Sequence, residues 1–161
     1  MILPIHTIGD DILREECRNV TEDDFKRGYP FDVNTLISDM FDTVRVSGGC
    51  GLSACQIGRD LRLFVIDADS LSDLYPECSG FSMVFINPVI IGSSYEKTKD
   101  VESCLSLPKK CFLIERYESI RLEYYDENME KHDEEFGGFI ARIIQHECDH
   151  LDGKLLCDYE N

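Results

Sequence analysis

The sequence predicts a single α+β domain, residues 1–161, in which mixed or antiparallel sheets pack around a central helix. The length of 161 residues suits one hydrophobic core. Two segments have the apolar spacing of helices, and several others have the composition of strands. Because these segments do not alternate regularly along the chain, we expect α+β rather than a doubly wound parallel sheet.

The first half of the chain contains one predicted helix and two predicted strands. In "FDVNTLISDMFDTVRVS" apolar residues recur at helical spacing, which predicts an amphipathic helix over 32–46. The three glycines of "SGGCG" end that pattern. "LRLFVID" (61–67) and "SMVFINPVII" (82–91) are rich in β-branched and aromatic residues, as strands are. The acidic stretch between them, 68–80, is predicted to be an exposed loop.

The second half contains a half-buried strand and a final helix. "SIRLEYY" (119–125) alternates apolar and polar residues, and a turn is expected at 126–128. Gly137 and Gly138 then precede a predicted helix over 139–152.

Charge and hydropathy exclude several classes of partner. The net charge of −16, from 16 basic and 32 acidic residues, repels phosphate. We therefore expect this chain to bind neither nucleic acid directly nor an anionic membrane surface. No apolar run approaches the roughly 20 residues that span a bilayer. The N-terminal residues have no signal-peptide pattern, so the expected location is the cytoplasm. The eight cysteines include no C-x-x-C pair and are expected to be mostly reduced thiols.

The last predicted helix places two histidines and a glutamate on its apolar side. In "QHECDHLDG", His146 and His150 lie one turn apart, which is the spacing of a metal chelate. At about 100° per residue, Phe139 and Ile143 share their stripe and Glu147 lies in the adjoining one. The residues that turn away are Arg142, Gln145, Asp149 and Asp152. Burial of a glutamate is costly without a partner such as a metal ion, although hydrogen bonds within the core are an alternative.

The third ligand of such a metal is not evident from spacing. Zinc proteases with this motif take it from downstream, but too little chain follows His150 for a second helix. The two other histidines lie near the N-terminus and in an acidic hairpin. A thiolate from "VESCLSLP" is attractive, but spacing does not favour Cys104 over Cys55 or Cys111.

Three motifs resemble a known family. "GCGLSACQIG", "ESCLSLP" and "QHECDHLDG" are similar, in this order, to the three signature motifs of the peptide deformylases. "IHTIGDDILREEC" and "INPVI" resemble flanking segments of that family, so the resemblance covers residues 2–158. It implies the deformylase fold, built around a metal-binding helix. The implied reaction is hydrolytic removal of the formyl group from the N-terminal formylmethionine of nascent polypeptides.

The resemblance also implies roles for individual residues. By position, the metal ligands are Cys104, His146 and His150, the acid/base is Glu147, and the oxyanion donors are the Gln56 side chain and the Leu105 backbone amide. The implied cofactor is one divalent metal ion per chain, physiologically Fe2+, with Zn2+, Ni2+ or Co2+ able to occupy the site.

The resemblance places a substrate groove beside the metal. Gly51 matches a glycine whose backbone lines that groove, and Cys50 precedes it where an aliphatic residue is usual. Phe139 and Ile143 are placed to wall a pocket for the methionine side chain, to be part of the core, or both.

The chain also departs from the family pattern. Ser103 replaces the glycine of Glu-Gly-Cys, and Ser53 stands where alanine is usual. Many relatives continue into a C-terminal helix that helps some bacterial forms to dock on the ribosome. The chain stops after "LLCDYEN", so we do not expect ribosome association by that route. Such brevity resembles phage-encoded deformylases, so the cytoplasm is that of a bacterium or an infected host.

Two other functions share parts of this sequence pattern, and one scaffold contact is also expected. An endopeptidase would share the His-Glu-x-x-His motif, and a metal-stabilised binding module would close the site with a fourth protein ligand. In addition, Arg116 is expected to pair with Glu102 or Asp149 and so hold the ligand segment to the last helix.

Overall fold

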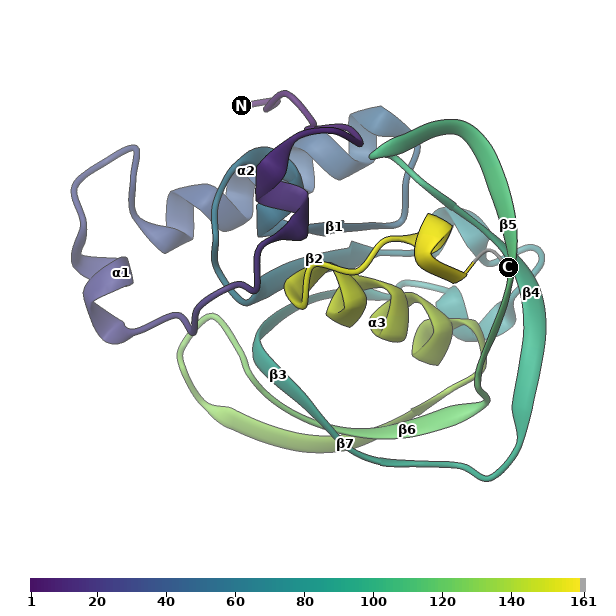
Figure 1. Cartoon of the computed structure of the whole chain (residues 1–161). Helices are drawn as coiled ribbons and strands as arrows, with labels where there is room; N and C mark the ends of the chain where they lie inside the picture. Colours follow the sequence, from purple (N-terminus) through teal and green to yellow (C-terminus); the bar gives the residue numbers. More distant parts are fainter. Residues whose placement is uncertain (160–161) are drawn as a thin grey trace.

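The structure, a computed structural model, describes residues 1–159 as an α+β fold with two antiparallel sheets (Figure 1). One sheet has the strand order β1-β2-β3-β6-β7, and β4 and β5 form a separate hairpin. The strands are β1 (Gly51–Ser53), β2 (Leu63–Asp67), β3 (Ser82–Ser93), β4 (Lys97–Cys104), β5 (Leu107–Tyr117), β6 (Ser119–Tyr125) and β7 (Lys131–Gly137). The helices are α1 (Glu22–Lys26), α2 (Val33–Ser47) and α3 (Gly138–Leu151). The predicted fold class is confirmed.

The five-stranded sheet separates two hydrophobic clusters at β2. Phe64 and Ile66 belong to the cluster that contains the apolar residues of α3. Leu63 and Val65, on the opposite face, belong to the cluster formed with α2. Since successive strand residues point to opposite faces, a continuous apolar run is what a strand buried on both faces requires.

Helix α2 begins and ends as its sequence favours. The side chain of Asp32 accepts a hydrogen bond from the Thr35 backbone N–H at 2.9 Å, which caps the N-terminus. Gly48 follows the last turn with φ of 81°, a left-handed conformation that glycine adopts without strain.

The N-terminus of helix α3 is capped by a residue from the connection between β2 and β3. The Phe139 backbone N–H donates to the Glu77 carboxylate at 2.9 Å. A carboxylate there also compensates the positive end of the helix dipole. Residues 68–80, predicted to be an exposed loop, in fact contain two short 3-10 helices, Asp69–Leu71 and Pro76–Cys78, and Cys78 is fully buried. Most of this stretch is exposed, as predicted, but its acidic composition reveals neither the cap nor the burial of Cys78.

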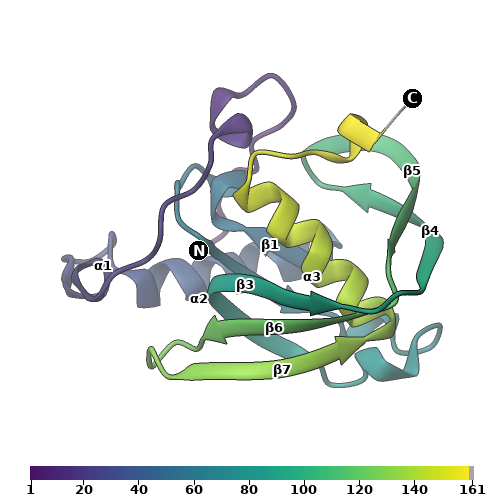
Figure 2. The same ribbon diagram turned by 60° about the horizontal axis from the view of Figure 1, so that its bottom comes forward.

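Helix α3 lies at the centre of the molecule, between the curved sheet and the β4–β5 hairpin (Figures 1 and 2). The hairpin covers a third hydrophobic cluster, which includes Cys104 and Phe112. The pairing of β4 with β5 shifts register between Ser103 and Cys104. An irregularity of this kind re-aims the side chains that follow it, and here it ends the strand at the thiol.

The face of α3 predicted to turn away is partly buried. Arg142 and Gln145 are 4% and 7% exposed, because the hairpin covers them. The Gln145 amide exchanges hydrogen bonds with the backbone of Tyr117, at 3.1 and 2.9 Å. A helical projection of α3 separates an apolar side from a polar side, but it does not show that the β4–β5 hairpin packs on the polar side.

Two other findings concern the chain as a whole. All eight cysteines have free thiols. None of the helices that the structure describes is both long enough and apolar enough to cross a lipid bilayer.

Candidate active site

Three side chains from two elements bring their donor atoms together. Cys104 ends β4, while His146 and His150 lie one turn apart on α3. One ligand atom from each lies within 4.8 Å of the others, an arrangement that can hold one metal ion. The Cys104 sulfur is 3.3 Å from Nε2 of His150. In a tetrahedral zinc site, with Zn–S of about 2.3 Å and Zn–N of about 2.1 Å, sulfur and nitrogen stand roughly 3.6 Å apart. The residues present therefore fit a metal.

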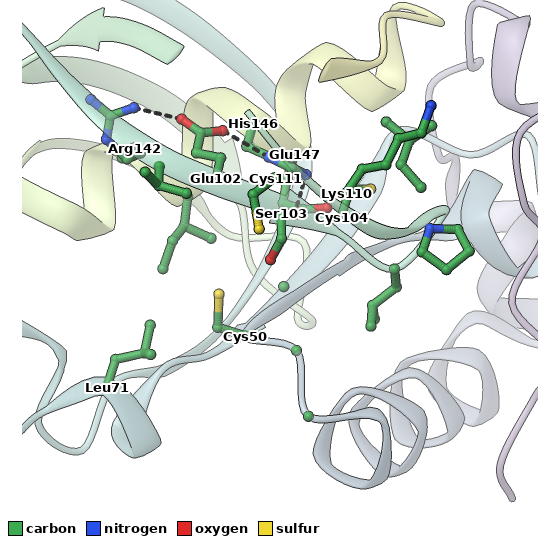
Figure 3. A pocket seen from close by; sticks show the side chains of 18 of the residues that line it. Cys50, Leu71, Glu102, Ser103, Cys104, Lys110, Cys111, Arg142, His146 and Glu147 are labelled. Atoms are coloured by element: carbon green, nitrogen blue, oxygen red, sulfur yellow. Dashed lines mark hydrogen bonds and ion pairs between the residues drawn. The ribbon is translucent and has the colours of Figure 1, made fainter. Parts of the chain in front are cut away.

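A buried carboxylate orients the first histidine. Glu102 accepts from Nδ1 of His146 at 2.9 Å, so Nε2 is the nitrogen left to face the thiol (Figure 3). Metal-binding histidines are commonly held in this way. Arg116 and Arg142 also bind Glu102, at 2.8 and 2.6 Å. Burial alone would raise the pKa of Glu102, but the hydrogen bonds from His146 and Arg116 lower it to about 2.

The surroundings shift the pKa values of the two imidazoles in opposite directions. Burial opposes protonation of His146, yet the Cys104 thiol and the Glu102 carboxylate raise its pKa to about 10. Burial and the positive charges of His146 and Arg116 lower the pKa of His150 well below its usual value. His150 is therefore neutral, which is the form that coordinates metals.

The expected scaffold contact of Arg116 is present with both partners. Its guanidinium binds Glu102 in two places, at 2.8 and 2.9 Å, and reaches Asp149 on α3 at 2.9 Å. The side chain is 4% exposed. Arg116 therefore joins the strand that carries Cys104 to the helix that carries both histidines.

Glu147 lies beside the donor atoms and is 3% exposed. Its Oε2 is 3.9 Å from Nε2 of His146, and its Oε1 accepts from the Ser53 hydroxyl at 2.8 Å. Burial raises the pKa of Glu147 above its ordinary value, although His146 and Ser53 oppose that change. A raised pKa means that this carboxylate accepts a proton more readily than one in water does, as an acid/base requires.

The side-chain amide of Gln56 points its NH2 group toward the thiol. Its Oε1 accepts from the Ser53 backbone N–H at 2.9 Å. Its Nε2 donates to the Ser106 hydroxyl at 3.1 Å and lies 3.7 Å from the Cys104 sulfur. Because the oxygen is already bound, this network fixes which end of the amide faces the site. Leu105, which follows Cys104, lines the same cavity.

A cavity of about 650 Å³ is lined by Gln56, Cys104, His146 and Glu147. Its walls include the four residues expected to bind substrate: Cys50, Gly51, Phe139 and Ile143. Ile143 is also part of the core, and Phe139 stacks on Tyr75 with ring centroids 4.0 Å apart. The cavity wall and the core thus share these side chains. Figure 3 shows the thiol of Cys50 on the side of the cavity opposite Glu102.

The remaining histidines lie elsewhere. His6 contacts Asp10 at 3.2 Å, and His132 binds Asp126 at 2.7 Å in the β6–β7 hairpin. Reasoning from the sequence missed the contact of Arg142 with Glu102. The available signal was its place on α3, one turn before His146.

Comparisons with known proteins agree with this geometry. The family model described as polypeptide deformylase matches residues 2–161. A peptide deformylase of Flavobacterium psychrophilum is 39% identical over 165 residues, covering 98% of this chain and 82% of the relative. That of Karelsulcia muelleri is 41% identical over 158 residues, covering 98% and 78%.

Solved structures show the same fold. The crystal structure of the peptide deformylase from Thermotoga maritima matches with a TM-score of 0.85 and 32% identity, over 98% of this chain and 97% of that one. An actinonin-bound class I type b peptide deformylase from Acinetobacter baumannii matches with a TM-score of 0.86 and 28% identity, over 100% and 99%. With the family model matched along nearly its whole length, the chain belongs to the polypeptide deformylase family.

Proposed function

We propose that this chain is a peptide deformylase that hydrolyses the formyl group from the N-terminal formylmethionine of nascent polypeptides and releases formate. One observation carries the proposal: a buried glutamate, Glu147, stands beside a cysteine and two histidines whose donor atoms lie within 4.8 Å of one another, and Glu147, Cys104 and His146 line one cavity. In this proposal the catalytic domain is the whole chain, 1–161, and it works in the cytoplasm of a bacterium or of a phage-infected host.

Cys104, His146 and His150 would hold one divalent cation. A cation bound by them supplies polarisation of the formyl carbonyl and makes water acidic enough to serve as nucleophile near neutral pH. We propose Fe2+ as the physiological metal, with Zn2+, Ni2+ or Co2+ as substitutes, since imidazole and thiolate ligands suit all of these ions.

Glu147 is assigned the proton transfers. Its carboxylate accepts a proton as the water oxygen attacks the formyl carbon, and it delivers that proton to the amine as the C–N bond breaks. The products are formate and a free N-terminal methionine. The position of Glu147 beside the donor atoms supports this assignment, and burial, which raises its pKa, makes its carboxylate a better proton acceptor.

Gln56 and Leu105 are assigned to the developing negative charge on the formyl oxygen. The Gln56 NH2 group faces the thiol side of the cavity, and its oxygen is held by Ser53. The second donor is the backbone N–H of Leu105, immediately after Cys104. Each such donor typically contributes about 3 kcal/mol to transition-state stabilisation.

The methionine side chain is assigned to the apolar part of the cavity. Cys50, Phe139 and Ile143 provide its wall, and the backbone of Gly51 lines the groove beside Glu147. The Acinetobacter baumannii neighbour has been solved with Met-Ala-Ser bound, which supports a peptide of this kind as the occupant here.

The competing endopeptidase function is separated by product analysis. The protein is incubated without oxygen with formyl-Met-Ala-Ser and, separately, with a longer peptide acetylated at its N-terminus. We expect the first to lose one CO unit in mass and the second to stay intact. Cleavage of internal peptide bonds with the formyl group retained would contradict the proposal.

A further inference from the structure

Ser53 connects two of the side chains assigned to the reaction. It is the last residue of β1, directly before a short 3-10 helix, Ala54–Ile57, and is fully buried. Its backbone N–H donates to Oε1 of Gln56 at 2.9 Å. Its hydroxyl donates to Oε1 of Glu147 at 2.8 Å and lies 3.3 Å from the Glu147 backbone oxygen. One residue thus contacts both groups, through different atoms.

The hydroxyl of Ser53 restrains a side chain that has few other restraints. Within residues 1–159, no other hydrogen bond reaches the Glu147 carboxyl group. Rotation about the last torsion of a glutamate is broad, so one fixed oxygen decides where the other points. The other oxygen, Oε2, lies against Gly51 and 3.9 Å from Nε2 of His146, on the cavity side.

We propose that the Ser53 hydroxyl is a positioning residue for Glu147: it holds Oε1 so that Oε2 faces the cavity and carries the proton during deformylation. The inference rests on the proposed function and adds a residue to it. The hydroxyl donates to Oε1 whether or not Oε2 is protonated, so the carboxyl keeps its orientation through both proton transfers.

The test replaces the hydroxyl in two ways. Ser53→Ala removes one atom and keeps the backbone N–H that binds Gln56. Ser53→Cys keeps an atom at the γ position, although a larger one, and substitutes a weak donor. Both variants are compared with the wild type in formate release from formyl-Met-Ala-Ser, together with metal content and thermal unfolding. Thr43→Val is the control, because it removes a buried hydroxyl on α2 that bonds only the backbone.

We expect kcat to fall about tenfold in both Ser53 variants, with KM within twofold and metal content unchanged. Thr43→Val should keep the wild-type kcat even if its unfolding temperature falls. If only one of the two Ser53 variants folds well enough to assay, we expect the same fall in kcat in that variant.

Several results would overturn the inference. They are wild-type kcat in either Ser53 variant, a rise in KM without a fall in kcat, or loss of activity in proportion to lost metal. Wild-type activity in Ser53→Cys alone would assign the effect to packing. A wild-type protein that holds metal and releases no formate would overturn the proposed function itself, and this inference with it.

Discussion

Gly51 offers a perturbation whose nearest contacts are atoms of the Glu147 side chain. A Cβ atom added at position 51 would lie 2.7 Å from Oε2 of Glu147, 3.1 Å from its Cδ and 3.2 Å from its Cγ. The backbone of Gly51 is not in the left-handed region, so alanine causes no strain of its own there. The expected effect of Gly51→Ala is therefore displacement of the glutamate.

The size of the displacement follows from contact distances. Carbon atoms in contact usually stand about 3.5–4.0 Å apart, so the carboxyl group must retreat by roughly 0.5–1 Å. Its other oxygen is held by Ser53, which limits the direction of that movement. A misplacement of about 1 Å costs roughly 100-fold in rate. Because the displaced atoms end a side chain, the loss of stability should be about 1–3 kcal/mol, as for ordinary overpacking.

The assay measures kcat for formate release and the thermal unfolding temperature of the same preparations. We expect Gly51→Ala to lose between about 30- and 100-fold in kcat while it remains folded at the assay temperature. Gly28→Ala is the matched control, because a Cβ at that position meets nothing within 4 Å. A kcat within threefold of the wild type for folded Gly51→Ala would refute the placement of Glu147 at the reacting centre.

Three further predictions concern stability, pH and metal. Arg116→Ala leaves the buried Glu102 short of a partner and should lower the free energy of unfolding by about 3 kcal/mol, with loss of metal retention. The control Arg121→Ala removes one side of an exposed ion pair and should lower it by less than about 1 kcal/mol. Equal losses for the two variants in denaturant titrations would contradict this prediction. The Arg18 guanidinium lowers the pKa of Asp24 to about 2, so this pair stabilises the fold above the ordinary pKa of 3.8 and stops doing so as the pH falls through about 2. The exposure of Arg18 reduces the contribution of this pair, so Arg18→Met should lose about 1 kcal/mol of stability at pH 6, and this difference should vanish below about pH 2. A pH-independent difference in urea unfolding would contradict this prediction. Finally, a chelator should abolish activity and lower the unfolding temperature, and added metal should restore both. An iron-loaded preparation should also lose activity in air, whereas zinc- or nickel-loaded ones should not.

Much of the fold could be predicted because its signals are local. The apolar spacing of α2 and the alternation of β6 are read directly from neighbouring residues, and the predicted range 119–125 matches Ser119–Tyr125. Strands β4, β5 and β7 were not predicted. Their sequences are polar or charged at many positions, because much of the surface of these strands faces solvent. Even two apolar residues of the β4–β5 hairpin, Val101 and Leu113, are exposed.

Some features of the site could be predicted from residue spacing, and others could not. Spacing alone places His146, Glu147 and His150 on one side of a helix. The choice of Cys104 over Cys55 and Cys111 needed the resemblance, because only the fold brings the end of β4 to α3. Spacing does not reveal what each side chain is held by. The Ser53 hydroxyl at Glu147 joins residues 94 positions apart, so it depends on tertiary structure.

The most direct test of the account is formate release from a formyl-methionyl tripeptide by protein prepared without oxygen, with Glu147→Ala measured beside it. The account predicts formate from the wild type and a loss of several orders of magnitude in the variant, with metal still bound to both. If the wild type is folded, holds one metal ion per chain and releases no formate, Cys104, His146 and His150 form a site with another purpose. If Glu147→Ala keeps the wild-type rate, the proton is carried by a different group.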